Sequence, residues 1–171
     1  MHVTAAAHDD RVPLEPDRLD DHRGRLLRAA YAMCGSRNDA EDLVQEAYER
    51  VLRRPRLVRR DRDLAYLLRV LRHVWGTWVA SEKRRPATAV APQDLEWLVD
   101  ERATPELAME VSMAYAAIAE LSEPLRATIV AVDVAGLSYK EAAQSLRTRT
   151  GTIMSRLYRA REQVAMRMGA S

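Results

Sequence analysis

The stretch GLSYKEAAQSLRTRTGTIMSRLYRAR, at positions 136–161, decides the fold of the C-terminal part of the chain. Ser138 is followed three residues later by Glu141, a capping-box spacing that predicts a helix start, and we expect a short helix over 139–146. A turn is predicted over 147–151. A second helix with one buried side follows, because apolar residues return at helical spacing: Ile153, Leu157, Ala160 and Val164. This pattern predicts a helix-turn-helix.

The other side of the second helix, with the residues before it, carries hydrogen-bond donors that suit phosphates and base edges. A recognition helix needs an apolar back that holds it in its domain and a cationic front that meets DNA. The candidate DNA contacts here are Lys140, Arg147, Arg149, Thr152, Ser155, Arg156 and Arg159. Taken alone, this stretch leaves DNA binding and a merely solvated, arginine-rich helical hairpin equally open.

The composition of the 171-residue chain predicts an all-α fold. It is 47% hydrophobic, which is typical of globular proteins, and it contains only 6 Gly and no Phe. Leu, Ala, Arg and Glu recur at helical spacing, whereas strand patterns are scarce. The sequence shows no signal peptide and no apolar run near the roughly 18 residues of a membrane span. We therefore expect a cytoplasmic protein without membrane insertion.

Charge is unevenly distributed along the chain, although the net charge is only +2. Residues 1–85 carry 18 basic and 14 acidic side chains, residues 86–135 carry 2 and 9, and residues 136–171 carry 7 and 2. Two basic stretches on either side of an acidic one favour two separate contacts with a polyanion. The acidic middle segment is then expected either to avoid the polyanion or to mimic it.

The sequence contains no catalytic or metal-binding pattern that we recognise. Cys34 lies in an apolar helical stretch and is interpreted as a core residue, with redox sensing as the lesser alternative. No Cys or His stands at metal-ligand spacing from any of the four histidines, His2, His8, His22 and His73. A Gly-rich phosphate loop and a nucleophile–base pair are also missing. We expect no enzymatic activity, no cofactor and no metal site.

Breaks in the helical pattern divide the chain into two small helical domains. The polar N-terminus, punctuated by proline, predicts a mobile tail over 1–18. Three helices are expected over 19–85, and the acidic, Ala- and Pro-rich stretch 86–104 predicts a flexible linker. Residues 105–168 are expected to form a four-helix domain that includes the helix-turn-helix at 138–161.

The three N-terminal helices have separate start and stop signals. Gly35 is expected to end the first helix, and Asn38 is expected to cap the second. The third helix is predicted to begin at Asp63. The arginine-dense stretch 53–62 between the second and third helices is expected to be a loop, either near phosphate or simply solvated.

Two features of these helices are candidates for function. The second helix carries polar, mostly acidic side chains in its first turn and on its outward face: Asp39, Glu41, Asp42, Gln45, Glu46 and Glu49. Trp75 and Trp78 lie three residues apart on the apolar ridge of the third helix. Their position favours core packing, with stacking against unpaired bases as the alternative.

With both halves in view, the chain resembles the bacterial sigma factors of the extracytoplasmic-function (ECF) class, which keep only sigma regions two and four. The resemblance covers roughly residues 20–168. One motif is DAEDLVQEA at 39–47, similar to the acidic region-two helix of the family. The other is GLSYKEAA at 136–143 followed by GTIMSRLYRAR at 151–161, similar to the region-four helix-turn-helix.

The resemblance implies contacts with RNA polymerase and with promoter DNA. In the family the acidic helix binds the clamp helices of the polymerase β′ subunit, which would assign to polymerase binding Asp39, Glu41, Asp42, Gln45, Glu46 and Glu49. The third helix meets the minus-ten promoter element, where a base is extruded; this would assign to minus-ten binding Arg69, Arg72, His73, Thr77, Trp78, Lys83, Arg84 and Arg85. Region four would read the minus-thirty-five element through the seven candidates of the helix-turn-helix. The polymerase β flap and an anti-sigma factor are further partners that the family implies.

The charge of the second helix agrees with a protein partner, because a row of carboxylates on a protein that approaches DNA would repel the duplex. A stand-alone helix-turn-helix regulator is the alternative. It explains the C-terminal domain but leaves the acidic helix and the acidic linker without a purpose. The sequence therefore favours a promoter-specificity subunit without catalysis of its own.

Three departures from the family pattern concern the elements that would read DNA. His73 and Thr77 stand where the family usually has Asn and Asp, which puts the minus-ten sequence in doubt. Arg147 and Arg149 stand where Gly and Pro are common, so that either Arg147 adopts a left-handed conformation or the turn differs. Met154 replaces a common Lys and removes one phosphate contact.

Overall fold

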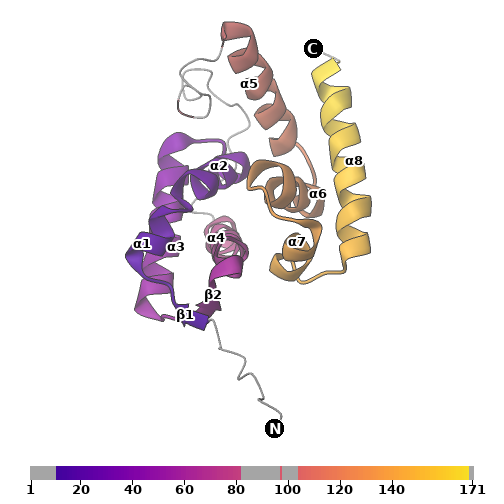
Figure 1. Ribbon diagram of the computed structural model, residues 1–171. Coiled ribbons are helices and arrows are strands. Elements are labelled where there is room, and N and C mark those ends of the chain that lie inside the picture. The colour runs from indigo at the N-terminus through magenta and orange to yellow at the C-terminus, as the bar shows by residue number, and fades with distance from the viewer. Residues whose placement is uncertain (1–10, 82–96, 98–103, 170–171) are drawn as a thin grey trace.

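The computed structural model describes residues 11–81, 97 and 104–169. In this part of the chain nearly all regular structure is helical, and the helices form two groups that lie side by side (Figure 1). The all-α architecture of two helical domains is confirmed. Most of the predicted linker lies outside the described residues. None of the helices in the described part of the chain has the length and apolarity needed to cross a membrane.

The N-terminal domain packs its helices around a core and adds a small antiparallel sheet. Its elements are β1 (Arg11–Pro13), α1 (Pro16–Asp20), α2 (Arg23–Cys34), α3 (Arg37–Arg53), β2 (Leu57–Arg59), the 3-10 turn η1 (Arg60–Arg62) and α4 (Asp63–Ala80). α3 packs against both α2 and α4. Leu43, Val51 and Leu71 are fully buried in this core. Cys34 is buried as well, as its apolar surroundings in the sequence predict.

The predicted mobile tail is wrong from Arg11 onward, because β1 and β2 form a two-stranded sheet in which Val12 lies opposite Val58. The stretch 53–62, expected to be a loop throughout, thus contributes one of the two strands. Each strand has only three residues and depends on a partner far along the chain. A strand this short shows no alternating pattern, so nothing local in the sequence predicts it.

Two details of the helix boundaries also differ from expectation. The predicted first helix is divided into α1 and α2, with residues 21 and 22 between them. Ser36, and not Asn38, caps α3: its backbone is extended and its side chain accepts a hydrogen bond from the Asp39 amide. Gly35, at φ 71°, ends α2 in the left-handed conformation that glycine permits, as predicted.

The C-terminal domain contains four α-helices, of which the last two form the helix-turn-helix. Its elements are α5 (Pro105–Ala119), α6 (Glu123–Ile129), the π-helical turn η3 (Val130–Val134), α7 (Tyr139–Ser145) and α8 (Thr150–Gly169). The predicted capping box is confirmed, because the Ser138 hydroxyl accepts from the Glu141 amide while a Glu141 carboxylate oxygen accepts from the Ser138 amide.

A continuous apolar core runs through both domains. Tyr31 of α2, which is only 1% exposed, packs its ring against that of Tyr115 in α5, with 5.5 Å between the ring centroids. α4 packs against α7 (Figure 1), and α2 packs against η3. The two domains therefore lie in direct contact.

Candidate functional site

The seven predicted DNA contacts of the helix-turn-helix gather on α7, the turn and the first half of α8; we call them the recognition surface. Five are exposed, namely Lys140, Arg147, Arg149, Ser155 and Arg159, and two are half-buried, namely Thr152 and Arg156. The opposite side of α8 is apolar and buried through Ile153, Leu157 and Ala160. α8 thus has the two faces that a recognition helix needs.

Two exposed ion pairs connect α8 to other elements of the C-terminal domain. Arg161 donates from Nε and Nη2 to the two carboxylate oxygens of Asp133 in η3, at 2.9 and 2.7 Å. The hydrogen bond to Asp133 keeps the pKa of Arg161 above its ordinary value. Nearer the C-terminus, Arg167 donates to Glu120 at 3.0 Å and so connects α8 to the end of α5.

The turn of the helix-turn-helix is strained at one residue. Arg147 has φ 51°, so that the left-handed conformation is the one of the two alternatives that the chain adopts, and it is the one non-glycine residue with positive φ in the part of the chain that the structure describes. The Arg147 amide donates to the Gln144 carbonyl at 3.3 Å, and the Thr148 amide donates to the Ala143 carbonyl at 2.9 Å. These bonds close the end of α7. The exposed Arg147 side chain extends the positive charge of the recognition surface.

The acidic side chains of α3 form a ladder of ion pairs, and we call the six predicted polymerase contacts the acidic face. Glu41 pairs with Arg37 at 3.2 Å, and Glu49 pairs with Arg53 at 3.1 Å. Asp42 and Gln45 are exposed, whereas Asp39 lies half-buried in the first turn. Exposed pairs of this kind contribute little to stability, so their carboxylates can exchange partners at small cost.

Glu46 differs from its neighbours on α3 because it reaches another helix. Trp78 of α4 donates Nε1 to Glu46 Oε2 at 2.6 Å, and Arg50 donates Nη2 to Glu46 Oε1 at 2.8 Å. Trp78 is half-buried, whereas Trp75 belongs to the core. The choice between core packing and base stacking therefore has different answers for the two rings: Trp75 packs, and Trp78 keeps part of its surface accessible.

The other predicted minus-ten residues on α4 have mixed surroundings. Arg69 lies over the ring of Tyr66, with Cζ 5.3 Å from the centroid. His73 and Thr77 are exposed, and the Thr77 hydroxyl donates to the His73 carbonyl at 3.0 Å. The remaining three predicted contacts lie outside the described residues: Lys83, Arg84 and Arg85.

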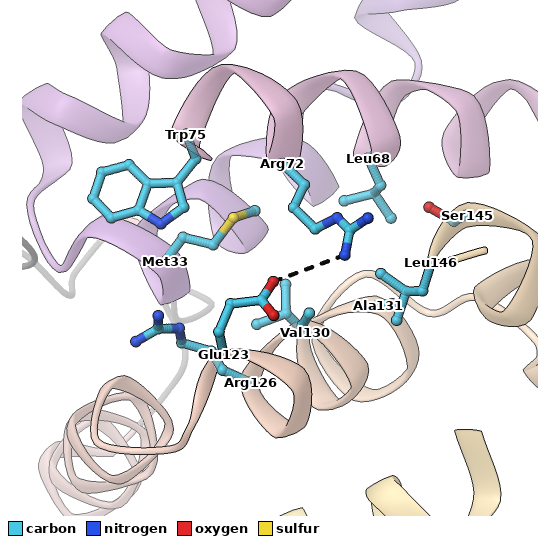
Figure 2. A pocket seen from close by; sticks show the side chains of 11 residues that line it. Met33, Leu68, Arg72, Trp75, Glu123, Arg126, Val130, Ala131, Ser145 and Leu146 are labelled. Carbon is cyan, nitrogen blue, oxygen red and sulfur yellow. Dashed lines mark ion pairs between the residues drawn. The ribbon is translucent and has the colours of Figure 1, made fainter. Parts of the chain in front are cut away.

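Arg72 points into the boundary between the two domains. Figure 2 shows its guanidinium directed toward Glu123 of α6, and the two groups form an ion pair at 3.8 Å. They line a cavity of about 30 Å³ together with apolar side chains from both domains, among them Met33, Trp75 and Val130. Arg72 therefore faces the domain boundary, whereas the predicted minus-ten residues His73 and Thr77 are exposed.

Trp97, from the predicted linker, docks on the N-terminal domain. Its ring meets that of Tyr31 edge-on, with 5.6 Å between centroids, and the Arg37 guanidinium lies 5.8 Å from the Trp97 centroid. Because Tyr31 also contacts Tyr115, one buried ring joins the N-terminal domain, the linker and α5. The acidic–aromatic composition of the linker signals some docking, but nothing local identifies Tyr31 as the receiving residue.

A basic groove lies beside the sheet, and the sequence indicates only part of it. It has a volume of about 500 Å³ and is lined by five arginines, Arg11, Arg56, Arg59, Arg62 and Arg69, together with Tyr66 and Gln144 among others. The density of arginine in 53–62 indicates the middle of this groove. The sequence does not indicate that Arg11 belongs to this groove, because its position there depends on the pairing of β1 with β2.

An acidic helix in one domain and a helix-turn-helix in the other define a two-domain protein of the sigma-70 type. Residues 19–85 match the family described as Sigma-70 region 2, and residues 112–164 match the family described as Sigma-70, region 4. The chain belongs to the ECF sigma factors, which are promoter-recognition subunits of RNA polymerase.

Individual relatives support the same assignment. The ECF RNA polymerase sigma factor SigE of Mycolicibacterium smegmatis is 31% identical over 157 residues, which span 90% of this chain and 61% of the relative. The RNA polymerase sigma-H factor of Pseudomonas aeruginosa is 30% identical over 137 residues, or 74% of this chain and 71% of the relative. The sigma factor RpoE of Bartonella quintana, solved in complex with the anti-sigma factor NepR, shares the fold with a TM-score of 0.64 at 20% identity, over 89% of this chain and 92% of that one.

Proposed function

We propose that the chain acts as a sigma subunit in which three surfaces have separate tasks. The recognition surface of α7 and α8 reads the minus-thirty-five element in duplex DNA. The exposed end of α4, with the basic residues that follow it, contacts the minus-ten element. The acidic face of α3 binds the clamp helices of the polymerase β′ subunit. In this proposal the protein has no catalytic activity of its own and works where polymerase and promoter are, in the cytoplasm.

The observation that carries the proposal is the presence of two oppositely charged, exposed surfaces on one small protein. The recognition surface is cationic on an apolar back, as DNA reading requires. The acidic face is negative and cannot bind the same polyanion. A stand-alone DNA-binding regulator accounts for the first surface only, whereas a sigma subunit uses both.

The chemistry of the acidic face suits a basic protein partner. Glu41 and Glu49 are held by arginines of their own helix in exposed pairs, at 3.2 and 3.1 Å. Cationic groups of the clamp helices can replace these arginines with little loss, since exposed pairs contribute about 0–1 kcal/mol each. Complementary charge of this kind mainly sets the rate and the specificity of association.

The position of Arg72 suggests that the domains separate when promoter DNA binds. In the closed arrangement its guanidinium pairs with Glu123 beside the interdomain cavity (Figure 2). Contact of the Arg72 guanidinium with DNA would compete with this pair. The pair is long, at 3.8 Å, and Glu123 is exposed, so the pair itself contributes little to the closed arrangement, which is held mainly by the apolar core that the two domains share.

An anti-sigma factor is a further proposed partner. The structural relative from Bartonella quintana was solved with one. A protein that bridged the two domains of the present chain in their closed arrangement would keep Arg72 inside the interdomain boundary and would oppose promoter binding.

The test of the proposed function is promoter-dependent run-off transcription with purified core polymerase on a library of genomic fragments. Replacing Asp42 and Glu46 together by Lys should abolish polymerase binding, whereas the matched reversal Glu162→Lys on α8 should leave it intact. Arg156→Ala should weaken promoter binding by about 1–3 kcal/mol without changing polymerase affinity. Tight binding of duplex DNA together with a failure to bind core polymerase would refute the proposal in favour of a stand-alone regulator.

A further inference from the structure

One carboxylate joins the acidic face of α3 to Trp78, a predicted minus-ten contact on α4. Glu46 is a residue of α3, and Trp78 lies 32 residues later on α4. The Trp78 Nε1 group donates to Glu46 Oε2 at 2.6 Å, a short hydrogen bond to a charged acceptor. The bond therefore connects a candidate polymerase contact directly to a candidate DNA contact.

The other carboxyl oxygen of Glu46 has a different partner. Arg50, one turn further along α3, donates to Oε1 at 2.8 Å, and both side chains of this pair are 34% exposed. Glu41 and Glu49 pair with arginines of α3 in the same way, at 3.2 and 3.1 Å. The indole of Trp78 is the partner that distinguishes Glu46. Glu46 is thus held from the solvent side by a replaceable arginine and from the protein side by an indole.

The indole needs a partner to be held in one orientation. Trp has a single polar group, a donor, and the rotation of its ring is fixed when that donor is bonded. Trp78 is half-buried, two residues before the end of α4. Its ring is consequently orientated by packing on one side and by the Glu46 carboxylate on the other.

We propose that Glu46 is a positioning residue for Trp78 and thereby couples polymerase binding to promoter opening. This inference rests on the proposed function. A cationic group of the polymerase takes the place of Arg50 at Oε1 and immobilises the Glu46 side chain. Because Oε2 still accepts the indole N–H, the Trp78 ring is then fixed in the orientation that contacts the unpaired minus-ten strand.

Four variants separate the two roles of Glu46, and each is measured twice: for affinity toward core polymerase and for the fraction of promoter opened at saturating sigma. Glu46→Gln keeps an oxygen that can accept the indole N–H but loses the charge, so polymerase affinity should fall while opening stays within about twofold of wild type. Glu46→Ala loses both functions, and its opening should fall about tenfold, as expected for one lost hydrogen bond to a charged group.

Trp78→Phe keeps an aromatic ring but loses the donor, so opening should fall similarly at unchanged polymerase affinity. Glu49→Ala, the matched control, should change affinity alone.

The double variant Glu46→Ala, Trp78→Phe makes the test quantitative. If both residues act through one bond, the double variant should open the same fraction of promoter as the single variant that opens less. If their roles are independent, the two reductions should multiply. The inference is overturned if Glu46→Ala opens the promoter like wild type at saturation, if Glu46→Gln opens it as poorly as Glu46→Ala, or if the reductions multiply. Should Glu46→Ala fail to fold, promoter opening by Trp78→Phe is compared with opening by Glu46→Gln. The proposal requires a clear reduction for Trp78→Phe and none beyond about twofold for Glu46→Gln. Failure of the wild-type protein to bind core polymerase would instead refute the proposed function itself.

Discussion

Arg18 and Asp63 form a buried ion pair that holds the N-terminal segment against the first turn of α4. Their side chains are only 11% and 5% exposed. The guanidinium donates Nε to Asp63 Oδ2 at 2.9 Å and Nη1 to the Pro13 carbonyl at 2.7 Å. One cation thus satisfies the carboxylate at the start of α4 and a carbonyl of β1, and so connects β1 to α4.

We expect Asp63→Ala to lower the free energy of unfolding by about 3–5 kcal/mol, because it leaves the Arg18 guanidinium buried without its counter-ion. Urea denaturation followed by circular dichroism measures the change. The control is Asp61→Ala, which removes an exposed partner of Arg59 and should cost less than about 1 kcal/mol. Equal effects of the two variants would show that burial of the pair is unimportant.

Arg147→Gly should stabilise the protein by about 1 kcal/mol, since glycine adopts the left-handed conformation without the steric cost that a Cβ brings. The matched variant Arg149→Gly also removes one cation from the recognition surface but relieves no positive φ, and it should not stabilise. Both should weaken DNA binding. Thermal melts and DNA titrations of the two variants check these effects, and a lower melting temperature for Arg147→Gly would contradict the assignment of strain.

Glu123→Arg should open the boundary between the domains, because it places a third cation beside Arg72 and Arg126. We expect a larger radius of gyration by small-angle scattering. Binding of a single-stranded minus-ten oligonucleotide should tighten by up to about 1 kcal/mol, the upper range for an exposed pair. The control Glu120→Arg reverses a charge that pairs with Arg167 inside the C-terminal domain. If both variants scatter like wild type, the ion pair does not contribute to closure.

Acidification should destabilise the N-terminal domain through His22. Burial lowers the pKa of His22 below its ordinary value of 6.5, against the opposing effect of nearby Asp63. The folded state therefore disfavours the protonated ring, so that this contribution to stability is present above pH 6.5 and is lost as the pH falls below it. Denaturation at pH 7.5, 6.5 and 5.5 should show a shallower decline for His22→Gln than for wild type. His73→Gln, which changes an exposed histidine, should follow wild type.

The parts of the fold that the sequence predicts are those that depend on local chemistry. The Ser138–Glu141 capping box and the left-handed end of α2 at Gly35 each follow from a few adjacent residues. The same holds for the apolar back of α8, which the spacing of its residues predicts. Helix caps and helical periodicity are local properties, and no knowledge of the tertiary fold is needed to recognise them.

The parts that the sequence does not predict are those made between distant segments. The β1–β2 sheet, the Arg72–Glu123 pair and the Trp78–Glu46 bond join elements whose relative position no local pattern specifies. Hence the sequence places the candidate site residues on their individual helices, whereas it does not predict the contacts between them.

Tyr31 sets a limit on treating the two domains as interchangeable modules. Its ring receives Trp97 from the linker and Tyr115 from α5, so each domain covers apolar surface that belongs to the other. Exchanging the C-terminal domain for that of a relative would leave Tyr31 facing side chains not shaped to meet it. Expression of residues 11–81 alone would expose this ring to water and add an apolar patch of the kind that promotes aggregation. Chimeric sigma factors built on this chain therefore need the Tyr31, Trp97 and Tyr115 rings transferred together.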